Sequence, residues 1–206
     1  MTSKQNKSQV IRAGRIGEGH LVEVSRLSVA KDGQSQQFGI DLQSLPVPDR
    51  RLSCDTVSFV RTDYMVKLLF AQKEVVGEGY LAMVVVQMTF DAIHNFLRSV
   101  NTLEAGLKEL MNGQYPTGEV VQIKEKPQQS AVVTANLVFA GYSGTDACLD
   151  FYYTSPFSIK SINILNKVSV EPVVRINVPT HLLVAMYSSL QKIAHSLPSN
   201  IGKVTS

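Results

Sequence analysis

Apolar and polar residues alternate along several short segments of the chain, and this period of two predicts β-strands. Turn residues separate the segments: Asp32-Gly33 tolerates the positive φ of a tight hairpin, and Gly77 and Gly79 mark a second one. The predicted strands of the first half are 20–29, 37–42, 56–60, 64–71 and 80–88. Those of the second half are 131–139, 147–153, 159–165 and 168–178, with a turn at 141–144.

Two segments change to helical spacing, with apolar residues three or four positions apart. The first runs from Ile93 to Leu110 and the second from Leu182 to Ile193. Thr89 is the predicted N-cap of the first helix, because its hydroxyl can accept a hydrogen bond from an amide of the first turn. Pro179 opens the second helix, where its missing N–H costs nothing. Each helix follows the last strand of a strand-rich segment.

This order of elements occurs twice. Placing Thr62-Asp63 on Thr145-Asp146 requires an offset of 83 residues, whereas the last strands and the helices align at an offset of 90. An enlarged hairpin around 156–166 would absorb the difference of seven, since loop insertions cost little free energy. The sequence therefore predicts an α+β fold with two β-β-β-α repeats, an antiparallel sheet and helices packed on one face.

The chain divides into five predicted segments, of which the two repeats form one compact domain. The connector includes a candidate edge strand whose lysines would discourage pairing between edges. The segments are a flexible arm (1–18), N-terminal strands with repeat one (19–112), a connector (113–130), repeat two (131–198) and a tail (199–206).

Composition is that of an ordinary globular protein, with 206 residues of which 44% are hydrophobic and 18% charged. A formal charge of +3 is too small to indicate a nucleic-acid partner by itself. Cys54 and Cys148 lack zinc-site spacing and are expected to be buried free thiols. Because there is no apolar signal segment and no run long enough to span a membrane, we expect a cytoplasmic protein without membrane contact.

No pattern of catalytic residues is found. The glycine-rich segment 14–19 lacks the Gly-Lys-Ser/Thr ending of a phosphate loop, and there is no Gly-x-Ser-x-Gly elbow. His94 and His181 lie near the two helix starts, but no carboxylate or thiol joins them at ligand spacing. We therefore predict no enzymatic activity, no cofactor and no metal.

Basic and aromatic residues on the strands are the candidate partner-binding groups, because single-strand nucleic-acid binders combine both on one face. Acidic residues are interleaved with them. Lys67 and Asp150 fall at equivalent places in the repeat alignment, either as an ion pair or, as we favour, as two independent solvent-facing residues. The candidates are Arg61, Tyr64, Lys67, Lys124, Lys126, Tyr142 and Tyr152.

The second repeat resembles small bacterial domains of unknown function that pair a strand hairpin with a proline followed by an amphipathic helix. The resemblance covers about a third of the chain, and in the first repeat Phe90-Asp91 stands where the proline is expected. The tandem arrangement also looks like export chaperones of the SecB type and single-strand DNA-binding proteins of the Whirly type, without transfer of any functional residue. The segments concerned are 135–139, 147–152 and 174–183.

The strand Leu81-Ala-Met-Val-Val-Val is apolar on both faces and needs a cover on each. Helices can cover one face, so the other must meet the second repeat, another subunit or a client protein. The sequence therefore favours a non-enzymatic protein-binding or assembly module, structural or chaperone-like, that acts as an oligomer. Single-stranded nucleic-acid binding through the sheet face is the alternative. An enzyme with a dispersed site is a third hypothesis.

Overall fold

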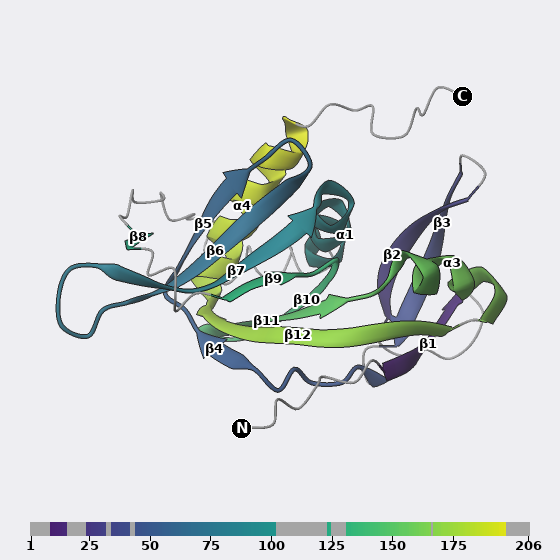
Figure 1. The fold of residues 1–206 in the computed structure, drawn as a ribbon, viewed down its shortest axis with the longest axis horizontal. Coiled ribbons are helices and arrows are strands. Elements are labelled where there is room, and N and C mark those ends of the chain that lie inside the picture. The colour runs from purple at the N-terminus through teal and green to yellow at the C-terminus, as the bar shows by residue number, and fades with distance from the viewer. Residues whose placement is uncertain are drawn as a thin grey trace.

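The computed structural model describes residues 9–15, 24–31, 34–41, 44–101, 123–124, 131–165 and 167–196 (Figure 1). Its mixture of strands and helices confirms the predicted α+β class. The elements of the first half are β1 (Gln9–Arg15), β2 (Val24–Lys31), β3 (Gln34–Asp41), β4 (Arg51–Ser53), β5 (Thr56–Arg61), β6 (Met65–Lys73), β7 (Tyr80–Thr89) and α1 (Phe90–Asn101). Those of the second half are β8 (Ile123–Lys124), β9 (Ala131–Thr134), β10 (Leu137–Ser143), β11 (Asp146–Tyr153), α3 (Pro156–Leu165), β12 (Lys167–Pro179) and α4 (Thr180–His195).

The described strands form two mixed sheets. The larger has the order β10-β11-β12-β1-β3-β2, with β4 also paired to β12. The smaller has the order β5-β6-β7-β8, with β9 also paired to β7. The expectation of a purely antiparallel sheet is wrong, because β4 runs parallel to β12, and β8 and β9 run parallel to β7. These parallel neighbours come from distant parts of the chain, as parallel pairing requires a crossover connection.

The chain segment that contains β4 and β5 passes from the larger sheet to the smaller one between Cys54 and Asp55. The Cys54 amide donates to the Asn177 carbonyl of β12 at 3.0 Å, whereas the Asp55 amide donates to the Ala71 carbonyl of β6 at 2.9 Å. The Asp55 carboxylate also accepts from the Lys73 amide at 2.8 Å. As a result, β4 belongs to the larger sheet and β5 to the smaller.

The chain segment that contains β9 and β10 passes in the opposite direction, from the smaller sheet to the larger one. The Ala135 amide donates to the Gln87 carbonyl of β7, and the Asn136 amide donates to the Tyr152 carbonyl of β11, both at 3.0 Å. The Asn136 side chain accepts from the Thr154 amide at 2.8 Å and donates to the Thr154 carbonyl at 2.6 Å. Strand pairing therefore follows a closed circuit: β11, β12, β4–β5, β6, β7, β9–β10 and back to β11.

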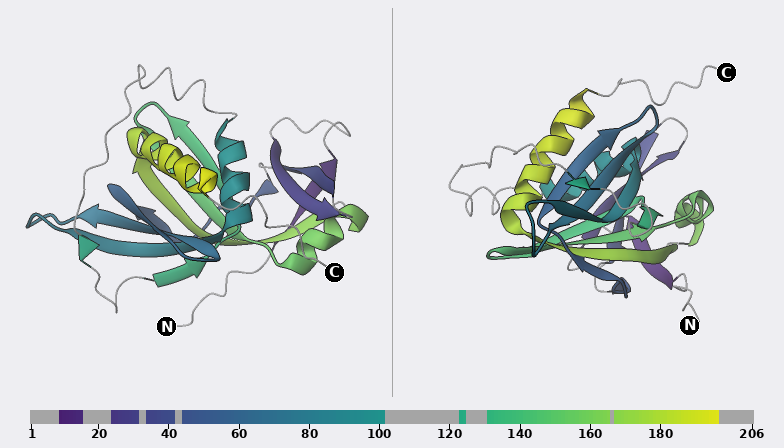
Figure 2. Two further views of the ribbon diagram at one scale, coloured as in Figure 1. Left: turned by 90° about the horizontal axis from the view of Figure 1, so that it is seen from above. Right: turned by 60° about the vertical axis from the view of Figure 1, so that its left-hand side comes forward.

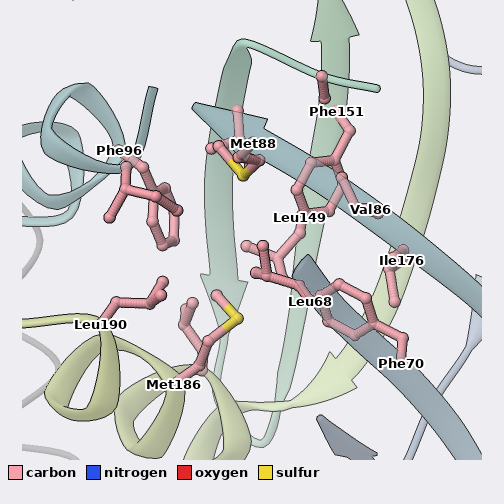
Figure 3. Close-up of a cluster of buried hydrophobic side chains, with 14 of the residues drawn as sticks. Leu68, Phe70, Val86, Met88, Phe96, Leu149, Phe151, Ile176, Met186 and Leu190 are labelled. Carbon is pink, nitrogen blue, oxygen red and sulfur yellow. The ribbon is translucent and has the colours of Figure 1, made fainter. Parts of the chain in front are cut away.

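The core lies where the inner faces of the two sheets meet helices α1 and α4 (Figure 3). Leu68 and Phe70 of β6 point toward Leu149 and Phe151 of β11, and Met186 of α4 lies beside them. The Phe70 and Phe151 rings meet edge to face with centroids 5.8 Å apart. Helix α1 follows β7 but lies against β10, and α4 follows β12 but lies against β5 (Figure 2). Each helix therefore ties the two sheets together.

Both predicted helix starts are present. The Ala92 amide donates to the Thr89 hydroxyl at 3.3 Å, so Thr89 caps α1 as predicted. Pro179 is the N-cap residue of α4, and its ψ of 144° at a φ of −61° makes its backbone extended. Helix α1 is described as far as Asn101, and the remainder of the predicted helix lies outside the described residues.

The segment 159–165, predicted as a strand, belongs to helix α3. The Ser155 hydroxyl accepts a hydrogen bond from the Ser158 amide at 3.2 Å, and Pro156 takes the first helical position. These start signals outweigh the branched side chains of the segment, which otherwise favour strands. Helix α3 packs beside β12, apart from α1 and α4 (Figure 1).

Three further expectations are corrected. The segment 131–139 is not one strand, because its two parts pair with different sheets as β9 and β10. Gly141 lies inside β10, and the turn is at Gly144, whose φ is +61°. Residues 9–15 of the predicted arm form β1, which pairs with both β12 and β3. The predicted N-terminal hairpin is present as β2 and β3.

We expect Phe151→Ala to lower the free energy of unfolding by about 3–5 kcal/mol, because it removes a fully buried ring and leaves a cavity. Phe157→Ala in α3 is the matched control, since that ring is 82% exposed, and it should change stability by less than about 0.5 kcal/mol. Denaturant unfolding followed by circular dichroism measures both. Equal effects of the two substitutions would contradict the described core.

Candidate binding surfaces

The outer face of the smaller sheet carries a row of apolar side chains. Val84 and Val86 of β7 are buried in the core, so the alternation of a strand turns Val85 outward. Pairing places Leu69 of β6 and Val132 of β9 directly beside Val85. Leu69 and Val85 are half-buried, and Val132 is 61% exposed. We call Leu69, Val85 and Val132 the apolar row.

A row on the outer face of the larger sheet is charged instead. Pairing places Asp150 of β11, Arg175 of β12 and Arg51 of β4 side by side. The Arg175 guanidinium donates from Nε to Asp150 Oδ1 at 2.6 Å and from Nη2 to Oδ2 at 2.5 Å. This bidentate hydrogen bond to Asp150 raises the pKa of Arg175. Arg175 therefore stays positively charged on this face of the sheet.

Tyr152, predicted as a stacking residue, is buried. Its ring packs against Phe139 with centroids 5.7 Å apart, and its hydroxyl lies 3.5 Å from Asp150 Oδ2. Burial raises the pKa of Tyr152, and the nearby Asp150 carboxylate raises it further. The ring therefore has no open face on which a nucleic-acid base could stack.

Three other predicted residues, Arg61, Tyr64 and Lys67, lie at or near the β5–β6 turn. Arg61 is opposite the buried Val66 and Lys67 is opposite the exposed Val60, so these two side chains are on different faces of the sheet. Arg61 Nη1 donates to the carbonyl of Ser196 at 3.3 Å and to its hydroxyl at 2.9 Å. Since Ser196 is the C-cap of α4, the cation complements the negative end of that helix. Tyr64 is 79% exposed, and Lys67 is half-buried on the sheet.

The remaining predicted residues lie elsewhere. Tyr142 is on β10 in the larger sheet, where it packs against the core. Lys124 belongs to β8, which pairs with the beginning of β7. Lys126 lies outside the described residues. The predicted residues therefore do not form a single surface.

The suggested relation between Lys67 and Asp150 is not present. Lys67 is opposite Gln87 in strand register, on the smaller sheet. Asp150 is paired with Arg175 on the larger sheet, so it is neither a partner of Lys67 nor an independent solvent-facing residue. The alignment error behind this prediction is a shift of two residues in the second strand, which strand register alone reveals.

A depression of about 670 Å³ lies on the outer face of the larger sheet, one row from the Asp150–Arg175 pair. Here Gly141 is opposite Cys148, and Cys148 is opposite Asn177. Gly141 has no side chain, and a Cβ at this position would lie 3.7 Å from Cys148 Sγ. The sequence identified Gly141 only as a turn residue, so it contained no signal for this depression.

The two cysteines differ in environment, and both are free thiols. Cys54 is buried as predicted, and burial, followed by the adjacent Asp55 carboxylate, raises the pKa of its thiol to about 12. Cys148 is half-buried and lines the depression, so the expectation of a buried thiol is wrong for this residue. Cys54 also borders the depression but is only 2% exposed, so Cys148 is the more accessible thiol at this face.

Compared with known protein families and with curated protein sequences, the chain matches none of them. Within the described ranges, no three His, Cys, Asp or Glu side chains are placed to hold a metal ion. His94 and His181 are both exposed, on different helices. No helix of the described part is long and apolar enough to cross a membrane.

The Cys54 thiol should make stability depend on pH. An ordinary thiol has a pKa of 9.0, whereas the Cys54 thiol has a pKa of about 12 in the folded chain. Between these two pH values the unfolded chain has therefore lost a proton that the folded chain keeps. Stability is unaffected by this group below pH 9 and falls above it, by up to about 1.4 kcal/mol per pH unit. Cys54→Ala should remove this part of the alkaline decline, as measured by denaturant unfolding from pH 8 to 11.

Cys148→Ala is the control for this measurement, because it removes a thiol that is not in the core. It should keep the alkaline decline of the unsubstituted chain. If Cys54→Ala and Cys148→Ala gave the same pH profile as the unsubstituted chain, burial of the Cys54 thiol would not be what couples folding to pH.

Proposed function

We propose that the chain is a non-enzymatic protein-binding and assembly module that acts as an oligomer. The observation that carries the proposal is the apolar row of Leu69, Val85 and Val132 on the outer face of the smaller sheet. A contiguous apolar patch on a sheet face gains free energy when another surface excludes water from it. A second copy is the occupant that suits it, because a flat apolar face is complementary to itself in a two-fold contact.

The proposal includes two equivalent β-β-β-α units, β5-β6-β7-α1 and β10-β11-β12-α4. The strand pairing of the two units supports their equivalence, because both have the same register. The hairpin of the first unit has a bulge between Phe70 and Ala71, and that of the second has one between Phe151 and Tyr152, 81 residues later. Phe70 is opposite Val84 as Phe151 is opposite Val174. The last strands are thus offset by 90, and α3 lies within the hairpin that holds the nine additional residues.

The two sheet crossings follow the same offsets. The bond from Cys54 to Asn177 corresponds to the bond from Ala135 to Gln87. The Lys73 amide donates to the Asp55 side chain as the Thr154 amide donates to the Asn136 side chain, at 2.8 Å in each case. The same hydrogen bond from a backbone amide to a side chain thus occurs at both crossings. This match is more specific than apolar periodicity, which any strand shows.

In this correspondence the apolar row and the charged row occupy the same positions of the two units. One sheet therefore keeps charges where the other has aliphatic side chains, although both rows face away from the core. Charged side chains suit water, and aliphatic ones suit a covered surface. The equivalent residues are Leu69, Val85 and Val132 in one unit and Asp150, Arg175 and Arg51 in the other.

Single-stranded nucleic-acid binding is supported less well. It requires exposed aromatic rings among basic groups on one face. Tyr152 is buried, Tyr142 packs against the core, and Arg61 is engaged with the end of α4. Of the candidates in the described ranges, Tyr64 is exposed and Lys67 lies two residues from Leu69 of the apolar row.

We expect light scattering to show a multimer whose mass does not depend on salt, since the contact is apolar. Val85→Asp should reduce it to the monomer with the circular dichroism spectrum unchanged, because Val85 faces outward. Val84→Asp, one residue away, should unfold the chain, because it places a carboxylate in the core.

Asn177→Asp is the matched control, since it adds the same charge to the outer face of the other sheet, where Asn177 is exposed. It should leave the multimer intact. An unsubstituted chain that is monomeric at all accessible concentrations would sink the proposal. A multimer that survives Val85→Asp would exclude the apolar row as its interface.

A further inference from the structure

We propose that the depression beside Cys148 is a docking site for a basic segment of a polypeptide partner, which inserts a lysine or arginine side chain there. This inference rests on the proposed protein-binding function and gives it a second surface, on the sheet opposite to the apolar row. It is argued from the shape of the depression, from the charge of the residues around it and from its openness.

The shape results from two small residues at adjacent strand positions. In the smaller sheet the corresponding pair is Val60 opposite Lys67, both with large side chains. In the larger sheet it is Gly141 opposite Cys148. Ala147 and Val178 are buried and point into the core, so they present only backbone to this face. The space thus exists where the two units differ, and it is not a general property of the fold.

The charged residues that line the depression are of one sign, whereas Arg175 and Arg51 lie one row away from it. The lining residues include Asp55 and Asp146 and no lysine, arginine or histidine. Ser53, Ser143 and Asn177 add oxygen atoms that can accept hydrogen bonds. One Asp55 oxygen, Oδ2, accepts from the Lys73 amide, so the carboxylate is held in place. An occupant with N–H donors and a positive charge complements this lining.

The openness of the depression favours a polypeptide over a small molecule. Sites for small ligands bury most of the ligand surface in a concave pocket. Here the polar lining residues Ser53, Asp55, Ser143 and Asp146 are all exposed, and Cys148 and Pro179 add weakly polar and apolar atoms to the lining. A long basic side chain can lay its apolar stem on such a lining while its charged end reaches a carboxylate.

The Cys148 thiol provides a direct measurement of the charge around the depression. We expect a cationic methanethiosulfonate reagent to modify Cys148 about tenfold faster than an anionic one, after each rate is divided by the rate with a free thiol in solution. The difference should shrink with added salt. It should also shrink in Asp55→Asn/Asp146→Asn but persist in the control Asp63→Asn/Asp91→Asn, which removes two exposed carboxylates elsewhere. Peptide mapping separates Cys148 from the buried Cys54.

Occupancy is tested with defined peptides on the full chain. Pentalysine should protect Cys148 from an uncharged thiol reagent by about tenfold or more at saturation, and pentaglutamate should not. Gly141→Val restores the side chain found at the corresponding place in the other sheet, and its Cβ makes only an ordinary 3.7 Å contact with Cys148 Sγ. This variant should fold and should lose the protection by pentalysine.

The outcomes separate this inference from the proposed function. Val85→Asp should abolish the multimer and keep protection by pentalysine, whereas Gly141→Val should do the reverse. If the cationic reagent had no advantage, or if pentalysine protected the Asp55→Asn/Asp146→Asn variant equally well, the docking site would be refuted even with the multimer intact. Protection by pentaglutamate would refute it as well.

Discussion

The architecture depends on two places where adjacent amides donate to different sheets. At Cys54–Asp55 and at Ala135–Asn136 the chain stops pairing with the strands of one sheet and starts pairing with those of the other from one residue to the next. Each crossing is held by a side chain, Asp55 or Asn136, that binds the backbone of the hairpin it enters. Because of these crossings two segments of the chain run from one sheet into the other, and the inner faces of the sheets are kept opposite each other with α1 and α4 packed against both. The buried rings of Phe70 and Phe151 meet only because that arrangement is closed.

Features that depend on neighbouring residues were predictable from the sequence. Strands β5, β6, β7, β11 and β12 follow from alternation, and the start of α1 follows from the hydroxyl of Thr89. The change of partners at Ala135 was not predictable, because alternation continues through it and the deciding acceptors, on Gln87 and Tyr152, are far away in sequence. Helix α3 was mistaken for a strand because branched residues hid the local signal of Ser155-Pro156. The depression was missed because it is defined by the absence of a side chain at Gly141, next to Cys148, and only strand register brings those two together.

The outer faces of the two sheets differ in the chemistry of their side chains, whereas the inner faces do not. Inside, the two sheets contribute aliphatic and aromatic side chains to one cluster. Outside, one sheet is aliphatic along the row through Val85, while the other has the Asp150–Arg175 pair and, next to it, an acidic depression. Substitutions on outer positions leave the core unaffected, since alternate side chains of a strand face opposite sides. Two surfaces of different chemistry can therefore change independently on one framework.

The closed circuit of strand pairing also bears on how the chain reaches this state. Strand β4 pairs with β12, so residues near position 52 must find residues near position 176. Contacts between such distant parts of a chain form slowly, because the intervening loop must close before the pairing gains any free energy. Until then the edges of β7 and β12 that later receive β9 and β4 are unpaired. During synthesis β7 emerges before β9, and in that interval its unpaired edge is open to pairing with other chains.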